Sequence, residues 1–197
     1  MKNKHLYSVI ALGVVVVVLW LLLPKKDMCA DTVRGYKESA DASLSAIRSG
    51  YDSLSAKLKR EASIEVPPIR DLDAAKFSAL RACDVQCQLL TRCLRFVVFK
   101  APSAACPKEY GDLQETQKRA EQMLERLSNV KGEIDAAAQQ APAIAQAVAE
   151  VRELELTSGA TGTRLAQAQM KQETLEANMR AKVEQIAAEL AELQPAE

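Results

Sequence analysis

The sequence contains very little histidine and few aromatic residues. His5 is the only histidine among 197 residues, and the chain has three phenylalanines, four tyrosines and one tryptophan. Because no histidine follows residue 5, the rest of the chain offers neither a histidine general base nor a histidine zinc ligand. Large globular cores draw much of their buried area from aromatic rings. We therefore expect extended helices rather than one wide core.

Motifs for phosphate binding and nucleophilic catalysis are also missing. The only close glycine pair, Gly159 and Gly162, lies in a short Ser/Thr-rich segment, and no Walker loop, dinucleotide fingerprint or nucleophile elbow occurs. The acidic pair Asp71 and Asp73 precedes an apolar stripe and is better explained as helix capping. The 26 Lys and Arg residues balance 26 Asp and Glu residues, which gives no basic face for nucleic acid. We predict no enzyme activity, with no catalytic residue, metal ligand, cofactor, small-molecule substrate or nucleic-acid partner.

One apolar run dominates the N-terminal region. Residues 6–23 carry no charge and are interrupted only by Ser8 and Gly13. As a helix this run would be roughly 27 Å long, close to the roughly 30 Å of a bilayer core. We expect a single transmembrane helix that contacts lipid through residues 6–23. The length of the run and the charges after it favour a retained anchor over the alternative, a cleaved signal peptide.

The five cysteines are the only residues whose clustering suggests chemistry. Four of them lie close together in the sequence, and these candidate disulfide residues are Cys83, Cys87, Cys93 and Cys106. Their spacing matches neither paired Cys-x-x-Cys zinc sites nor a Cys-x-x-Cys redox motif. Structural disulfides are favoured, with free buried thiols and a metal or redox site as alternatives, and sequence does not choose among the three possible pairings.

Cys29 stands apart, a few residues beyond the apolar run, and is expected to be a free thiol or to pair with a second copy. Acylation is a further alternative if the body is cytoplasmic. Lysines flank the run on both sides, so the positive charges do not decide its orientation. The clustered cysteines favour an oxidising compartment. We therefore expect a single-pass protein of the cell (inner) membrane, with its body on the periplasmic or another oxidising side.

Beyond the anchor, the apolar periodicity is helical throughout, which predicts an all-α fold. Pro67 and Pro68 stop the first helix, and a turn rich in proline, serine and alanine follows the second. The expected helices are 30–62, 71 to about 100, 108–156 and 164–193. The expected domains are an N-terminal tail and anchor (1–26), a membrane-proximal helical pair with the cysteine cluster (27–107), and a coiled-coil hairpin (108–197).

The longest predicted helix carries a heptad pattern. Leu113, Ala120, Leu127, Ile134, Ala141 and Val148 recur every seven residues, and an interleaved set begins at Thr116 and Met123. Pro142 interrupts the helical hydrogen bonds without shifting the stripe, so a kink is expected there. The seven-residue segment 157–163 predicts an antiparallel hairpin with the last helix.

The two hairpin helices differ in length, which suggests an interaction surface. Folded back, the shorter helix would cover the longer one to about Leu127. Leu113, Ala120 and Met123 are therefore the candidate partner-binding face, unless the first two helices pack on them.

Together these features predict a non-enzymatic structural or accessory subunit that binds other proteins, possibly including itself, in a membrane-embedded assembly. One alternative is a phage-lysis tether of the spanin type, an analogy based on the shared outline of one N-terminal span and an external coiled coil. The other is a thiol-active or metal-binding membrane protein that uses the cysteine cluster.

Overall fold

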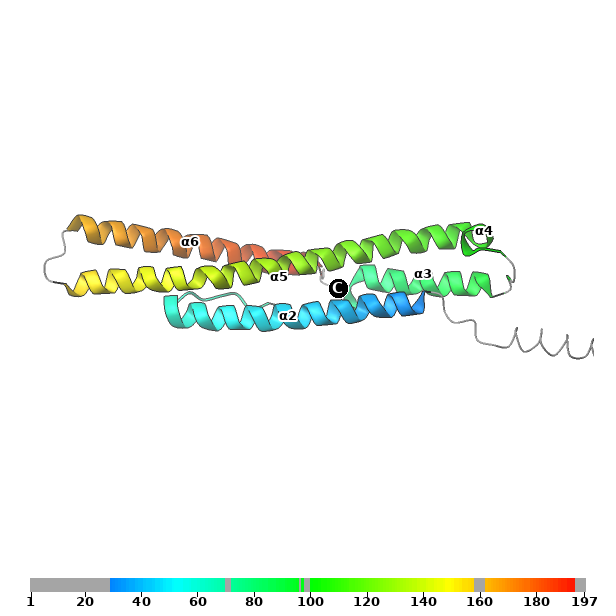
Figure 1. Ribbon diagram of the computed structural model, residues 1–197, viewed down its shortest axis with the longest axis horizontal. Helices are drawn as coiled ribbons and strands as arrows, with labels where there is room; N and C mark the ends of the chain where they lie inside the picture. Colours follow the sequence, from blue (N-terminus) through cyan, green and yellow to red (C-terminus); the bar gives the residue numbers. More distant parts are fainter. Residues whose placement is uncertain (1–28, 70–71, 96, 98–99, 158–161, 194–197) are drawn as a thin grey trace, which may run out of the picture.

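The computed structural model describes residues 29–69, 72–95, 97, 100–157 and 162–193, and within these ranges the chain forms helices and no strand (Figure 1). The elements are α2 (Ala30–Ala62), the 3-10 turn η1 (Ala74–Lys76), α3 (Ser78–Leu94), α4 (Pro102–Ala105), α5 (Pro107–Leu156) and α6 (Gly162–Leu193). The expected all-α class is confirmed.

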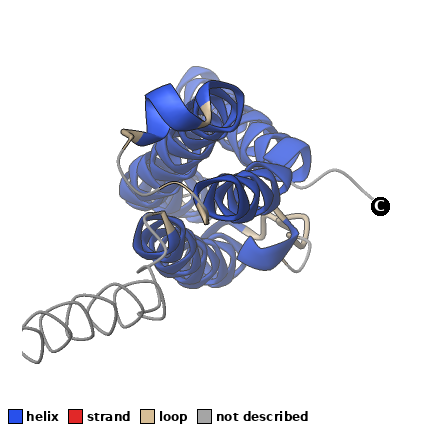
Figure 2. Cartoon of the chain, turned by 90° about the vertical axis from the view of Figure 1, so that its right-hand side faces the viewer, coloured by secondary structure: helices blue, strands red, loops and turns tan. Residues whose placement is uncertain are grey.

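Helix α5 is the axis on which the other helices pack. Its buried side chains recur every three or four residues from Leu113 to Val151, so one continuous apolar stripe faces the neighbouring helices. Helix α2 runs parallel to α5: Tyr36 donates a hydrogen bond to Glu121, and Gly50 lies against Ile134. Helices α3 and α6 run antiparallel to α5. The end-on view shows the helices clustered around one long axis (Figure 2).

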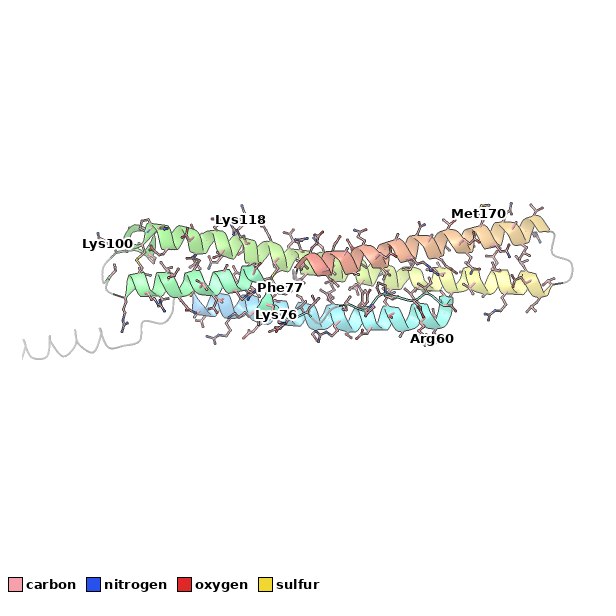
Figure 3. The ribbon with its side chains drawn as sticks, turned by 180° about the vertical axis from the view of Figure 1, so that it is seen from behind. Arg60, Lys76, Phe77, Lys100, Lys118 and Met170 are labelled. Atoms are coloured by element: carbon pink, nitrogen blue, oxygen red, sulfur yellow. A yellow bond between two sulfur atoms is a disulfide. The ribbon has the colours of Figure 1, made fainter. Side chains whose placement is uncertain are left out.

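Helices α3 and α6 follow one another along α5. The end of α6, at Leu193, and the beginning of α3, at Phe77 and Ser78, line the same groove beside Met123. Figure 3 shows Phe77 close to the level at which α6 ends. The stripe of α5 is therefore covered by α3 in its first part and by α6 in its later part, while α2 packs on the middle.

The chain after α2 turns back along that helix. Ser63 adopts a left-handed conformation with φ 54°, and the Ile64 N–H donates to the Leu58 carbonyl at 3.2 Å, which closes the helix end. The Tyr51 hydroxyl then donates to the Pro67 carbonyl at 2.7 Å. This bond gives a buried phenol its partner and holds the returning segment on α2.

The second helix is shorter than the sequence predicts. Asp73 caps η1 by accepting a hydrogen bond from the Ala75 N–H at 2.9 Å, while Asp71 lies outside the described residues. Helix α3 ends at Leu94 rather than near Lys100, and Pro102 begins α4. Helix α5 continues through Pro142 as one helix, and the kink expected there remains a prediction.

No helix in the described ranges is both long and apolar enough to cross a membrane. The predicted span, residues 6–23, lies outside the described residues. The predicted boundary between residues 107 and 108 remains a prediction. The main buried cluster draws residues from both sides of it, including Leu54, Phe77, Leu127 and Ile186.

Candidate functional site

Two disulfides join three helices at one end of the described body. Cys29, which precedes α2, is bonded to Cys87 on α3, with 5.7 Å between their Cα atoms. Cys93, near the end of α3, is bonded to Cys106, which precedes α5, with a Cα–Cα distance of 6.3 Å. Both distances lie in the ordinary range for disulfides. We call this region, made of the start of α2, all of α3 and α4, and the start of α5, the disulfide end.

The pairing differs from the sequence expectation at two cysteines. The sequence predicts Cys83 to be one of the disulfide residues, but it is a free, buried thiol. Cys29 was expected to be free or to pair between chains, and it is bonded within the chain to Cys87. The physical reason is the packing of α2 against α3, which brings the start of α2 beside Cys87. No helical period reports this contact, because it joins residues 58 positions apart.

Cys83 lies among α2, α3 and α5, within reach of Thr116 on α5. Burial raises the pKa of the Cys83 thiol, and the Thr116 hydroxyl on α5 lowers it by a smaller amount. Thr116 itself donates a hydrogen bond to the Leu113 carbonyl at 2.9 Å. The Cys83 side chain has no exposed surface. A protonated, fully enclosed thiol is a poor nucleophile and behaves as a small apolar side chain.

The disulfides hold a small separate core. Its buried members are Cys29, Val33, Cys83, Cys87, Leu90, Cys106 and Leu113. Only three of these seven are large aliphatic residues, so area burial alone supplies little stabilisation here. Covalent cross-links compensate for a small core by restricting the unfolded chain.

One group within the described ranges has metal-ligand geometry, and it belongs to a disulfide. The ligand atoms of Cys93, Cys106 and Glu109 lie within 4.8 Å of one another. The two sulfur atoms are bonded to each other, and metals bind thiolates rather than disulfide sulfurs. In this oxidised form the group offers one carboxylate and is not a metal site.

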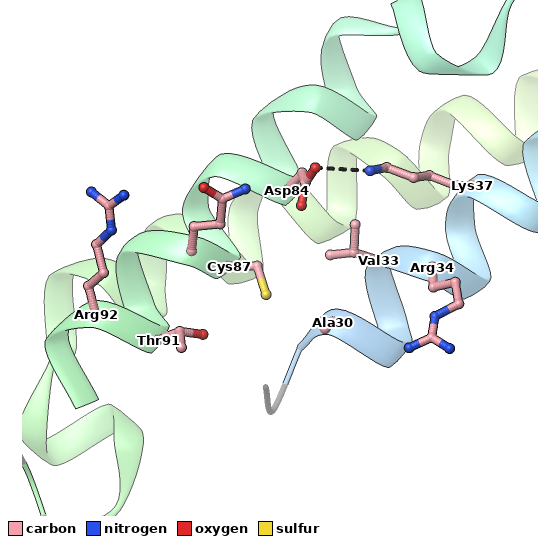
Figure 4. A pocket seen from close by; sticks show the side chains of 9 residues that line it. Ala30, Val33, Arg34, Lys37, Asp84, Cys87, Thr91 and Arg92 are labelled. Atoms are coloured by element: carbon pink, nitrogen blue, oxygen red, sulfur yellow. Dashed lines mark hydrogen bonds and ion pairs between the residues drawn. The ribbon is translucent and has the colours of Figure 1, made fainter. Parts of the chain in front are cut away.

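A groove of about 460 Å³ lies between α2 and α3, beside the Cys87 sulfur (Figure 4). Lys37 and Asp84 form an ion pair across it at 2.9 Å, and Arg34 pairs with Asp31 at 2.9 Å. These pairs neutralise most of the charge around the groove. Arg92, at the edge of the groove, forms no ion pair with any residue that the structure describes.

The candidate partner-binding face is buried by the chain itself. Leu113, Ala120 and Met123 are 4%, 0% and 7% exposed. Helices α2 and α3 pack over this part of α5, which is the arrangement that the sequence left open as the alternative to a partner. The expectation of a free face at these residues is corrected.

Within the described residues, the opposite end of the body consists of two helices, α5 and α6. We call residues 147–156 of α5 and 162–171 of α6 the distal hairpin. The buried side chains here are Ala147, Val151 and Ala168, whereas Leu156 and Met170 are 80% and 67% exposed. Lys171 and Glu150 pair across the two helices at 3.0 Å. The helical periodicity does not single out this surface, although the alanines that replace large residues in the stripe indicate a thin core.

Comparisons of the chain with protein-family models, with curated proteins and with solved structures found no match.

Proposed function

We propose that this protein is a non-enzymatic, membrane-anchored rod that serves as a structural or accessory subunit and binds other proteins through its distal hairpin. The anchor is the apolar run at residues 6–23, and the disulfide end is the part of the body next to it. The observation that carries the proposal is the Cys29–Cys87 disulfide.

This disulfide lies where the anchor joins the body. Only residues 24–28 separate the apolar run from Cys29, and a chain of that length spans at most about 20 Å. A force on the anchor would reach Cys29 first. The bond to Cys87 passes that force directly to α3, and the Cys93–Cys106 bond passes it on to α5. Two covalent links therefore protect a junction whose apolar core is small.

The same disulfides support an oxidising location for the body. Disulfides persist in secreted and periplasmic proteins and are rare where thiol reductants are abundant. Four of the five cysteines are bonded, and the fifth is enclosed in the core. This distribution fits a structural use of cysteine.

The distal hairpin is the surface best placed to meet a partner. Helix α5 has 50 residues, so at 1.5 Å per residue it extends about 75 Å along the rod. Helix α2 ends before the hairpin tip, as Figure 1 shows, so only α5 and α6 continue. Leu156 and Met170 are exposed apolar side chains at this end, and exposed apolar residues are suitable contacts for another protein.

Photo-crosslinking in native membranes tests this proposal. A photoreactive amino acid would replace Met170 in one variant and Lys59, an exposed residue of α2, in a control variant. We expect a discrete crosslinked product from position 170 and none from position 59, together with resistance of the chain to alkaline extraction from the membrane. Equal products at the two positions would overturn the partner assignment, and extraction of the chain at alkaline pH would overturn the anchor.

A further inference from the structure

We propose that the disulfide end docks on an anionic bilayer surface through Arg92, Arg95, Lys100 and Lys108. This inference rests on the proposed membrane anchor and assigns the body a fixed contact with lipid headgroups. The four side chains, here called the basic cap, are all exposed. They come from the end of α3, the segment before α4, and the start of α5.

The basic cap differs from the rest of the body in its charge. No Asp or Glu occurs between Asp84 and Glu109, whereas acidic and basic residues are interspersed along the other helices. Several exposed bases elsewhere pair with acids, as in Arg119–Glu115, Arg126–Glu192 and Lys171–Glu150, although others such as Lys118 and Lys131 form no ion pair within the described ranges. None of the four cap residues forms an ion pair with a residue that the structure describes. Glu109 follows the cap on α5 but is half-buried beside the Cys93–Cys106 disulfide.

Apolar side chains lie next to these cations. Val85 and Leu89 are 53% and 40% exposed on α3. Their spacing of four residues, followed by three to Arg92, places all three on one face of the helix. Exposed apolar residues beside lysine and arginine are typical of surfaces that contact the interface of a bilayer.

The cap is also within reach of the headgroups. Cys29 is held beside Cys87, and the seven residues from Cys87 to Leu94 extend α3 by about 10 Å beyond that point. This direction is away from the distal hairpin, because α3 and the start of α5 form the opposite end of the rod (Figure 1). The anchor ends at most about 20 Å from Cys29. With the disulfide end of the rod facing the membrane, the cap lies within roughly 10 Å of the membrane surface even if the connecting residues are fully extended.

The groove between α2 and α3 is a weaker candidate for the same anionic groups. Lys37 and Arg34 are already paired with Asp84 and Asp31. A phosphate there would have to displace a carboxylate or bind Arg92 alone. The cap offers four charges that have no ion-pair partner among the described residues, each worth about fivefold in affinity for an anionic surface.

Lysine acetylation of the full-length protein in lipid nanodiscs tests the proposal, because α5 carries exposed lysines at increasing distances from its start. Lys108, Lys118 and Lys131 are exposed and lie at steps of roughly 15 to 20 Å along this helix. Screening confines surface electrostatics to about 10 Å at moderate salt. Acetylation at each lysine would be read by mass spectrometry in discs of phosphatidylcholine alone and in discs containing phosphatidylglycerol.

We expect Lys100 and Lys108 to be acetylated about fivefold more slowly in the anionic discs, with Lys118 and Lys131 unchanged and the protection lost at high salt. The double variant Arg92→Gln/Arg95→Gln should reduce the protection of Lys108. The matched control Arg152→Gln/Arg164→Gln, with two exposed arginines of the distal hairpin, should leave it intact.

Equal acetylation of Lys100 and Lys108 in the two kinds of disc would overturn the docking proposal. The anchor is judged separately by retention in the phosphatidylcholine discs. If the chain stays in those discs but Lys108 is not protected, the anchor is supported and the docking of the cap is ruled out. If the chain associates only with anionic discs, in a salt-sensitive way, the docking of the cap is supported and the anchor is ruled out.

Discussion

The two ends of the rod use the same helix in different ways. At the disulfide end, α5 packs with α2 and α3, and two disulfides contribute cysteines to a core of seven buried residues. At the distal hairpin, α5 packs with α6 alone, no cysteine occurs, and the buried side chains are two alanines and one valine. Neither end has a large core. The disulfide end compensates with covalent bonds, whereas the distal hairpin relies on its continuity with the three-helix middle.

The contrast shows that one apolar stripe on α5 can pack against different sets of helices along its length. Between the two ends, α2, α5 and α6 share the main buried cluster, which includes Ile47, Leu127, Ile134 and Ile186. This middle section holds most of the large aliphatic side chains. We expect it to determine global stability, while the ends determine what the protein contacts.

The largest expected effect is a charge placed in the shared middle. Ile134 is 1% exposed and lies so close to Gly50 of α2 that a Cβ at Gly50 would come within 3.2 Å of it. The substitution Ile134→Asp should lower the free energy of unfolding by about 5 kcal/mol through lost burial and an unpaired charge. Chemical denaturation would measure it.

The matched control is Lys131→Asp on the exposed face of the same helix, with an expected cost below about 0.5 kcal/mol. Similar losses for the two variants would show that Ile134 does not belong to a shared core.

The next largest effect is the loss of stability expected when each of the two disulfides is removed in turn. Chain-entropy estimates for sequence separations of 58 and 13 residues give about 4 kcal/mol for Cys29–Cys87 and about 3 kcal/mol for Cys93–Cys106. The double variants Cys29→Ser/Cys87→Ser and Cys93→Ser/Cys106→Ser should follow this order in denaturant titrations. The reverse order would mean that the attachment of α2 to α3 is not the main role of cross-linking at this end.

Smaller losses of stability are expected when one buried side chain at each end of the rod is truncated to alanine. Leu113 at the disulfide end is 4% exposed and Val151 in the distal hairpin is 7% exposed. We expect Leu113→Ala to cost about 3 kcal/mol and Val151→Ala about 1 kcal/mol, because Val151 loses fewer atoms from a thinner core. A larger loss for Val151→Ala would show that the distal hairpin is packed as firmly as the rest.

The last expected effect is a loss of stability at high pH, and it arises outside the distal hairpin, which contains no tyrosine. Burial raises the pKa of Tyr51 to about 12. Burial and the hydrogen bond to Glu121 raise the pKa of Tyr36 to about 12. The unfolded chain ionises these phenols near pH 10, so their contribution is complete below pH 10 and is lost as the pH rises towards 12.

Denaturation between pH 9 and 12 should show this loss, and Tyr51→Phe should diminish it. At neutral pH the same variant should cost about 1 kcal/mol for the hydrogen bond to Pro67. An unchanged alkaline profile in Tyr51→Phe would contradict the assignment.

The helices of the body were largely predictable from the sequence because their apolar stripes are local and periodic. The range 30–62 matches α2, and the predicted end at Leu156 matches α5. The end of α3 was harder to predict, because the apolar residues from Phe96 to Phe99 continue the pattern beyond Leu94. Hydrophobic periodicity does not reveal the end of a helix when that end is set by tertiary packing.

The candidate site was less predictable because it depends on contacts between distant segments. Four cysteines in a cluster suggested pairing among themselves, yet Cys29 joins Cys87 and leaves Cys83 free. Sequence spacing places Cys83 and Cys87 on one face of a helix but does not say which neighbouring helix each will meet. The prediction of an exposed face at Leu113 was wrong for the same reason, since α2 and α3 cover it.

The central claim is that an intrachain disulfide clamps the body at the residue where the proposed anchor joins it. Disulfide mapping of the full-length protein, alkylated in native membranes and again after unfolding without reductant, tests it most directly. We expect linked peptides for Cys29–Cys87 and Cys93–Cys106, with alkylation of Cys83 alone and only after unfolding. Five alkylated cysteines, or a Cys29–Cys29 link between two chains, would contradict the account.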